Sequence, residues 1–197
     1  MISKIFLDET KIEKYRDEYA GTHCIFLPGF IEKNTLQSLL NKLEKSTFQL
    51  KLEMDGEDKF GKVLALPPKD TTLFIFNMLM NNTALFNTLQ HITDCAPIKN
   101  FAGRIHRSEA GENHEIGWHG DNADKRLLAM TLSLGTDKYT GAKFEMRKKG
   151  SENIIREFGQ LEVGDAFIFR IDPELQHRLA VLEGGRRTVG VGWFRGA

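Results

Sequence analysis

Apolar residues recur with two different periods, which divide this chain into a first part with helical spacing and a second part with strand-like spacing. In the first part, residues 8–20, 32–46 and 70–92 predict helices, and the last of these segments predicts one or two of them. The leucines of 32–46 give that helix one apolar face, at Leu36, Leu39, Leu40 and Leu43. Between the first two helices, HCIFLPGF (23–30) predicts a strand. The apolar residues of 70–92 are expected to be packing surface.

From about residue 97 onward, short apolar or alternating runs predict a series of strands. The runs are IKNFAGRIHR, RLLAMTLSLG, AKFEMRK, NIIREF, DAFIFRI, HRLAVLE and RRTVGVGWF. Turn signals separate them, as in GTDKYTG, KKGSEN, EVGD and EGG. Short strands at this spacing favour a β-sandwich or a small barrel. Because helices come first and strands later, we expect an α+β fold in which the helices buttress one side of the sheet.

The chain has 197 residues, which is the length of one domain that can bury a sizeable core. We therefore expect a single domain over 1–197, with helical support at about 1–95 and a β core at about 97–197. Apolar residues make up 41% and charged residues 27%, which is the composition of a globular chain and excludes the disordered class.

Charge and cysteine usage limit the partners further. Lys plus Arg and Asp plus Glu both number 27, so no net charge draws the chain to nucleic acid or to an anionic membrane. The N-terminal residues contain no apolar run long enough for a signal peptide, and no stretch of the chain reaches transmembrane length. Cys24 and Cys95 are far apart and form no CxxC pair, so neither a disulfide framework nor a zinc–thiolate site is expected. The expectation is a cytoplasmic protein with no membrane partner.

Candidate metal ligands occur in the stretch GWHGD. In an extended strand, residues i and i+2 point to the same side, so His119 and Asp121 can reach one ion. The intervening Gly120 adds no bulk beside the metal. His177, which follows the apolar run DAFIFRI, is the best candidate for a third ligand. Two imidazoles and one carboxylate are the ligands of non-haem Fe(II) oxygenases, and zinc also accepts them.

Two arginines follow the Gly-Gly pair in EGGRR. An oxygenase that uses 2-oxoglutarate must hold the far carboxylate of this cosubstrate, and a guanidinium offers two parallel donors for it. A two-residue turn at Gly184–Gly185 places Arg186 on the side of His177, whereas a three-residue loop places Arg187 there. The residues alone leave this choice open.

The order His119-x-Asp121, then His177, then Arg187 resembles the 2-oxoglutarate/Fe(II)-dependent dioxygenase superfamily, and within it the prolyl-4-hydroxylase-like group. Further segments resemble this family in the right order, from HCIFLPGFIEKNTLQSLL near the start to YTGAKF, GQLEVGDAFIF and QHRLAVLEGGRR followed by WF. The likeness spans most of the chain and is strongest over 100–195.

The resemblance implies a double-stranded β-helix, also called a jelly roll or cupin-like barrel, with Fe(II) at one mouth. It implies that His119, Asp121 and His177 are the metal ligands and that Arg187 binds the far carboxylate of 2-oxoglutarate. His106 sits where many relatives have a tyrosine that contacts the cosubstrate.

The chain departs from the family pattern beside Arg187. The family often has Arg-x-Ser, but this chain reads Arg-Thr-Val, so a hydroxyl group that helps to bind the cosubstrate carboxylate is either absent or supplied from elsewhere. Thr131 and Ser133, on the expected strand RLLAMTLSLG, are candidates. The second glycine of the family's turn is replaced by Ala142.

Substrate contacts are expected from residues near the metal ligands, at Arg104, Trp118 and Arg147. The two arginines suit an anionic substrate group, and the tryptophan offers an amphipathic ring. His114 is expected to be a loop residue that faces solvent.

The resemblance implies an enzyme that uses Fe(II), 2-oxoglutarate and O₂, with ascorbate as an in-vitro reductant, and releases succinate and CO₂. The expected reaction is hydroxylation of an unactivated C–H bond in a small molecule or in a protein or peptide side chain. Asp121 favours hydroxylation, or a related desaturation or ring reaction, over halogenation, because related halogenases have a small residue there. One alternative is an AlkB-type nucleic-acid demethylase, but the segment after Arg187 lacks the Arg-x-Asn-x-Thr-x-Arg motif. The other alternative is a cupin-like binding module without catalysis.

Overall fold

The predicted helical segments form four helices in the computed structural model, which describes residues 1–4, 6, 8–52, 59–60, 62–112, 115–123 and 125–197. These helices are α1 (Glu9–Thr22), α2 (Lys33–Leu43), α3 (Thr71–Met80) and α4 (Thr83–Thr93). Asp8, Asp70 and Asn82 begin three of them by accepting hydrogen bonds from backbone N–H groups of the first turn. The cap at Asn82 divides the predicted segment 70–92 into two helices.

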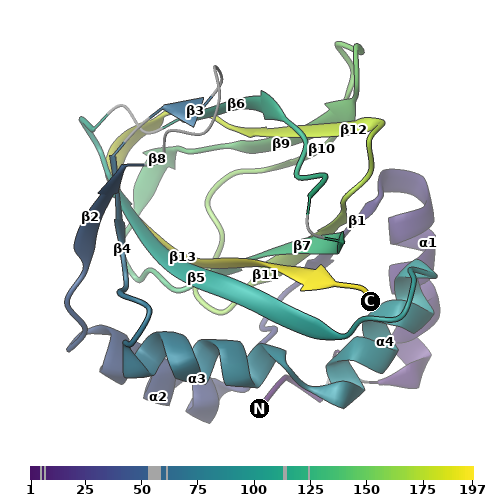
Figure 1. Cartoon of the computed structure of the whole chain (residues 1–197), viewed down its shortest axis with the longest axis horizontal. Coiled ribbons are helices and arrows are strands. Elements are labelled where there is room, and N and C mark those ends of the chain that lie inside the picture. The colour runs from purple at the N-terminus through teal and green to yellow at the C-terminus, as the bar shows by residue number, and fades with distance from the viewer. Residues whose placement is uncertain (5, 7, 53–58, 61, 113–114, 124) are drawn as a thin grey trace.

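The strands form two antiparallel sheets that face each other (Figure 1). The larger sheet contains, in spatial order, β1 (Cys24–Leu27), β11 (Ala166–Arg170), β7 (Arg126–Ser133), β13 (Leu182–Arg195), β5 (Asn100–Glu109), β4 (Lys62–Ala65) and β2 (Gln49–Leu52), and β8 (Tyr139–Gly141) also pairs with β13. The smaller sheet contains β10 (Ile154–Phe158), β9 (Phe144–Lys148), β12 (Leu175–Leu179), β6 (Glu115–His119) and β3 (Lys59–Phe60). The two facing sheets enclose the interior of a barrel.

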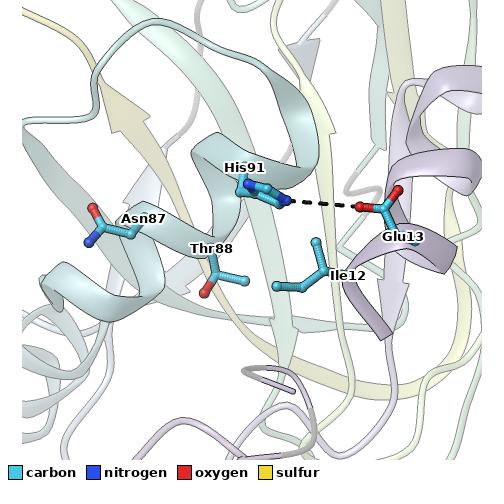
Figure 2. A pocket seen from close by; sticks show the side chains of 5 residues that line it. All are labelled: Ile12, Glu13, Asn87, Thr88 and His91. Carbon is cyan, nitrogen blue, oxygen red and sulfur yellow. Dashed lines mark ion pairs between the residues drawn. The ribbon is translucent and has the colours of Figure 1, made fainter. Parts of the chain in front are cut away.

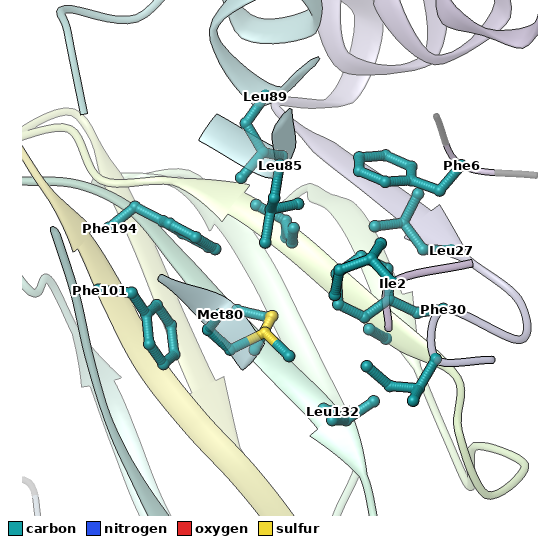
Figure 3. Packing of buried hydrophobic residues seen from close by; sticks show 14 of the residues in the cluster. Ile2, Phe6, Leu27, Phe30, Met80, Leu85, Leu89, Phe101, Leu132 and Phe194 are labelled. Atoms are coloured by element: carbon teal, nitrogen blue, oxygen red, sulfur yellow. The ribbon is translucent and has the colours of Figure 1, made fainter. Parts of the chain in front are cut away.

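The helices cover the outer side of the larger sheet, as expected from the sequence. Figure 1 shows α2, α3 and α4 along β5, β13 and β11, with the smaller sheet on the opposite side of the barrel. Alternation along β7 divides its side chains between two apolar clusters. Leu132 packs toward the helices, together with Met80, Leu85, Phe101 and Phe194 (Figure 3).

A second apolar cluster fills one side of the space between the two sheets. Ala129 of β7 faces this space, and the other buried members are Cys24, Phe144, Met146, Phe167 and Phe169. Burial of these side chains on one face of each sheet holds the sheets together, since apolar area removed from water stabilises the contact.

The chain after His177 differs from the prediction. The run HRLAVLE was predicted as one strand, but it contains the end of β12 and the start of β13, which belong to different sheets. Gly184 and Gly185 lie inside β13 and pair with β8, so the prediction of a turn at these glycines was wrong. The chain instead changes sheet between Leu179 and Leu182. The sequence patterns also did not predict strands β2, β3, β4 and β8.

None of the helices in the described part of the chain is both long enough and apolar enough to cross a membrane.

Candidate metal centre

Three side chains converge between the end of β6 and β12. His119 is the last residue of β6 and pairs directly with His177 on β12, while Asp121 follows two residues after the end of β6. One potential ligand atom from each of the three lies within 4.8 Å of the others, and no other group of three His, Cys, Asp or Glu side chains does so among the described residues. The Nε2 atom of His177 lies 3.6 Å from Asp121 Oδ2, and that of His119 lies 3.8 Å from Asp121 Oδ1.

The tautomer of His119 places the lone pair of one ring nitrogen in this cluster. Its Nδ1 lies 2.8 Å from the carbonyl oxygen of Gly117, and only a protonated Nδ1 can donate there. In the neutral imidazole, Nε2 then carries the lone pair that faces Asp121. A nitrogen lone pair and a carboxylate oxygen repel each other unless a cation lies between them. The donor set therefore fits a bound metal ion.

The carboxylate of Asp121 is held from two sides. Trp193 Nε1 donates a hydrogen bond of 2.9 Å to Oδ2, and Arg126 Nη1 lies 3.5 Å from Oδ1. The guanidinium of Arg126 also stacks over the Trp193 ring, with Cζ 3.9 Å from the ring centroid. Since the Asp121 side chain is only 10% exposed, these two contacts fix its orientation in a place that water hardly reaches.

Aromatic rings hold the second histidine. The ring centroid of Phe169 lies 4.7 Å from that of His177 in an edge-on arrangement, and that of Phe144 lies 5.8 Å away. His119 and His177 themselves have ring centroids 4.2 Å apart. The apolar cluster between the sheets therefore limits the rotamers that His177 can adopt.

A polar face of the larger sheet extends inward from this cluster. Val191 pairs with Arg104 on β5 and with Thr131 on β7, and directly paired residues share one face of a sheet. Trp193, two residues further along β13, lies on the same face and contacts Asp121. Arg104 and Thr131 therefore both face the interior on the side of the metal cluster. Arg104 also stacks on Trp193, with Cζ 5.2 Å from the ring centroid.

Arg187 lies on this same face, six residues before Trp193 on β13. It is an even number of residues from Trp193, and Val189 between them pairs with His106. Arg187 is 8% exposed, and its Nε has no hydrogen-bond partner among the described residues. Burial lowers the pKa of Arg187, and the nearby phenol of Tyr139 opposes this shift. A buried cation of this kind provides a binding site for an anion.

Arg186 faces the other way. Its guanidinium pairs with Asp137 at 2.9 Å, and both side chains are more than 40% exposed. Only Arg187 of the two arginines therefore points into the barrel. Ser133 is also buried on the interior face, where it pairs with Val189.

The fold is similar to that of solved oxygenases. An oxidoreductase of the 2OG-Fe(II) oxygenase family from Burkholderia pseudomallei superposes with a TM-score of 0.70 at 14% identity, covering 95% of this chain and 92% of that one. A prolyl-4-hydroxylase from Pseudomonas putida gives a TM-score of 0.67 at 15% identity, covering 95% and 100%. The alpha-ketoglutarate-dependent epimerase SnoN from nogalamycin biosynthesis gives a TM-score of 0.69 at 11% identity, covering 96% and 85%.

The chain has the 2-oxoglutarate/Fe(II) oxygenase fold. The predicted resemblance and the predicted α+β double-stranded β-helix are confirmed at this level. No protein-family model matches the sequence, and no curated protein sequence matches it. The likeness is therefore visible in the fold and in the cluster of His119, Asp121 and His177.

Two of the predicted substrate residues lie outside the barrel of this oxygenase fold. Trp118 precedes His119 on β6, so its side chain points to the outer face of the smaller sheet. There it is flanked by Arg147, with Cζ 4.0 Å from the ring centroid, and by Arg178 at 4.7 Å. The structure does not bring Trp118 or Arg147 to the metal cluster. His114 lies outside the described residues.

Sequence reasoning missed three residues of the site. Arg126 and Trp193 hold the Asp121 carboxylate, and Tyr139 contacts Arg187. Arg126 and Trp193 belong to segments that the sequence predicts as strands, whereas Tyr139 belongs to β8, which it does not predict. Their contacts, however, join segments far apart in the sequence, and no local pattern predicts such contacts.

A separate hollow of about 540 Å³ lies between α1 and α4. Figure 2 shows its lining side chains, Ile12, Glu13, Asn87, Thr88 and His91. His91 Nε2 lies 4.0 Å from Glu13 Oε1, and both side chains are more than half exposed. The hollow lies in the helical layer and shares no residue with the metal cluster.

Proposed function

We propose that this protein is an Fe(II)- and 2-oxoglutarate-dependent dioxygenase that hydroxylates a C–H bond of a small molecule or of a protein or peptide side chain. The observation that carries the proposal is the convergence of two imidazoles and one carboxylate within 4.8 Å on this fold. Such a set occupies one face of an octahedral ion and leaves three positions open. When bound, iron and 2-oxoglutarate supply the oxidising power and release succinate and CO₂.

His119, Asp121 and His177 hold the metal in this proposal. The bond from His119 Nδ1 to the Gly117 carbonyl keeps Nε2 available as a ligand. Zinc accepts the same ligands, and the choice of iron rests on the oxygenase fold together with a second anion site at Arg187.

Arg187 binds the far carboxylate of 2-oxoglutarate in the proposal. Its guanidinium is buried on the face that leads to the metal cluster, where a carboxylate is bound without competition from water. His106 and Thr131 line the same face and contact the bound cosubstrate.

Arg104 is the residue beside the metal cluster that contacts the substrate in this proposal. This arginine stacks on Trp193 close to Asp121, so its guanidinium can orient a substrate that carries an acceptor group. The proposed substrates are small molecules or peptides. The similar structures include a prolyl-4-hydroxylase, which supports hydroxylation at carbon.

Turnover of 2-oxoglutarate tests the proposal. The protein is supplied with Fe(II), ascorbate and O₂, and succinate is measured with and without panels of amino acids, peptides and small metabolites. We expect slow succinate formation without substrate and faster formation with a substrate. His177→Ala should abolish both, whereas His91→Ala, in the distant hollow, should leave them unchanged. Absence of succinate under every condition contradicts the proposal.

A further inference from the structure

Two glycines hold β8 directly against β13 just before Arg187. Gly184 pairs with Thr140 and Gly185 with Tyr139. Gly185 has φ +78°, and a Cβ atom there would lie 2.2 Å from the carbonyl oxygen of Lys138. Only glycine permits this approach of the two backbones. The Gly-Gly pair therefore fixes the position of Tyr139 relative to β13.

This pairing brings the Tyr139 side chain to the buried guanidinium. Gly185 is paired with Tyr139, and Arg187 is two residues further along the same strand, so Tyr139 and Arg187 are diagonal neighbours on one face. Tyr139 opposes the lowering of the Arg187 pKa by burial, as expected for a phenolic oxygen that faces the guanidinium. A phenol that accepts through its oxygen can still donate through its hydrogen.

The hydrogen-bond donors around Arg187 are suited to bind one carboxylate. Arg187 offers parallel N–H donors, and its Nε has no hydrogen-bond partner among the described residues. The next residue, Thr188, points away from the interior, since its hydroxyl accepts a hydrogen bond from Arg107. The hydroxyl that the sequence pattern lacks beside Arg187 is thus available from β8.

We propose that Tyr139 is a second donor of the Arg187 anion site and that its O–H group donates to the far carboxylate of bound 2-oxoglutarate. The inference rests on the proposed function and assigns a role to Tyr139, a residue to which the sequence patterns gave none. Arg187 binds the carboxylate and also orients the phenol, which adds a neutral, directional donor to the charge of the guanidinium. Tyr139 therefore favours a 2-oxo acid that carries a second carboxylate.

The test compares two ligands and two variants in binding experiments without oxygen. The ligands are 2-oxoglutarate and 2-oxopentanoate, which has the same carbon chain without the far carboxylate. Tyr139→Phe removes only the hydroxyl and keeps the ring. Tyr15→Phe removes a hydroxyl from α1, in the helical layer, and is the matched control. Each Fe(II)-loaded protein is titrated by calorimetry, and circular dichroism confirms that each is folded.

We expect Tyr139→Phe to weaken 2-oxoglutarate binding by about ten- to a hundredfold, the usual loss when a hydrogen bond to a charged group is removed. Its affinity for 2-oxopentanoate should stay within about twofold of the wild-type value, because that acid lacks the contacted group. Tyr15→Phe should bind both acids like the wild type.

Two results overturn the inference alone: unchanged binding of 2-oxoglutarate by Tyr139→Phe, or an equal loss for both acids. If the wild type binds neither acid, the proposed function fails and the inference fails with it.

Discussion

At the scale of single residues, Asp121 is the proposed ligand that lies outside the strands, and two side chains hold its carboxylate. Trp193 donates to one oxygen and Arg126 pairs with the other. Partners that orient a ligand contribute to metal affinity, because without them the ligand must be ordered when the metal binds. The tryptophan is thus a positioning residue for the metal centre.

Trp193→Phe tests this role. The change removes the N–H donor and keeps an aromatic ring for Arg126 to stack on, so we expect Fe(II) affinity to fall about tenfold. Affinity is measured by anaerobic titration with a competing chelator. Trp118→Phe, on the outer face of the smaller sheet, is the control and should bind Fe(II) normally. Equal affinities of both variants would count against the positioning role.

The sequence predicted some site residues because local rules apply to them. His119 and Asp121 are two apart, and both reach the cluster although only His119 lies on a strand. The same period-two rule assigns Trp118 to the opposite face once His119 is taken to point inward. That signal was present in the sequence. The contact of Trp193 with Asp121 spans 72 residues and has no local signal.

At the scale of secondary-structure elements, the unexpected feature is the path of β13. A Gly-Gly pair before a strand is typical of a hairpin turn, yet here it lies within the strand and receives β8. Periodicity predicts that a segment is extended, but it does not predict which sheet the segment joins. For that reason most strands were predicted, while the change of sheet between β12 and β13 was not.

Gly185→Ala tests the contact between β8 and β13. The added methyl group would meet the Lys138 carbonyl and would also strain a positive φ. Gly150→Ala is the matched control, because Gly150 has φ +75° but nothing within 4 Å of the added Cβ. In urea unfolding, Gly185→Ala should be less stable than Gly150→Ala by about 1 kcal/mol or more. Equal losses of unfolding free energy in the two variants would show that β8 can move away from β13 without cost.

At the scale of the whole molecule, a chain of zero net charge gathers arginines on one interior face. Arg104 and Arg187 both line this face of the larger sheet, and Arg126 contacts Asp121 at its edge. Net charge excludes only a global attraction to polyanions; it does not reveal how charge is distributed inside a barrel. The α+β class was predictable, because a helix with one apolar face must bury that face against another element, and here the later strands supply a sheet.

Metal binding should stabilise the whole fold. The cluster joins β6 and β12 and the segment after β6, so an ion bound only to the folded state shifts the unfolding equilibrium. At a metal concentration of about 100 times Kd, the gain is about 2.7 kcal/mol, which corresponds to a rise in Tm of about 5–10 °C for a chain of this size.

Differential scanning fluorimetry with Fe(II) under argon, and with Mn(II) as an air-stable substitute, measures this rise. Excess chelator should reverse it, and His177→Ala should not show it, while His91→Ala should. A rise of the same size in His177→Ala would mean that the metal binds elsewhere.

The most direct test of the central claim is whether binding of 2-oxoglutarate requires both the metal cluster and Arg187. Anaerobic calorimetry should show tight binding to the Fe(II)-loaded wild type and binding at least about tenfold weaker to the metal-free protein. Arg187→Met should bind Fe(II) normally but 2-oxoglutarate weakly, because the buried cation is lost. Binding of 2-oxoglutarate that is independent of iron, or unchanged in Arg187→Met, would contradict the account.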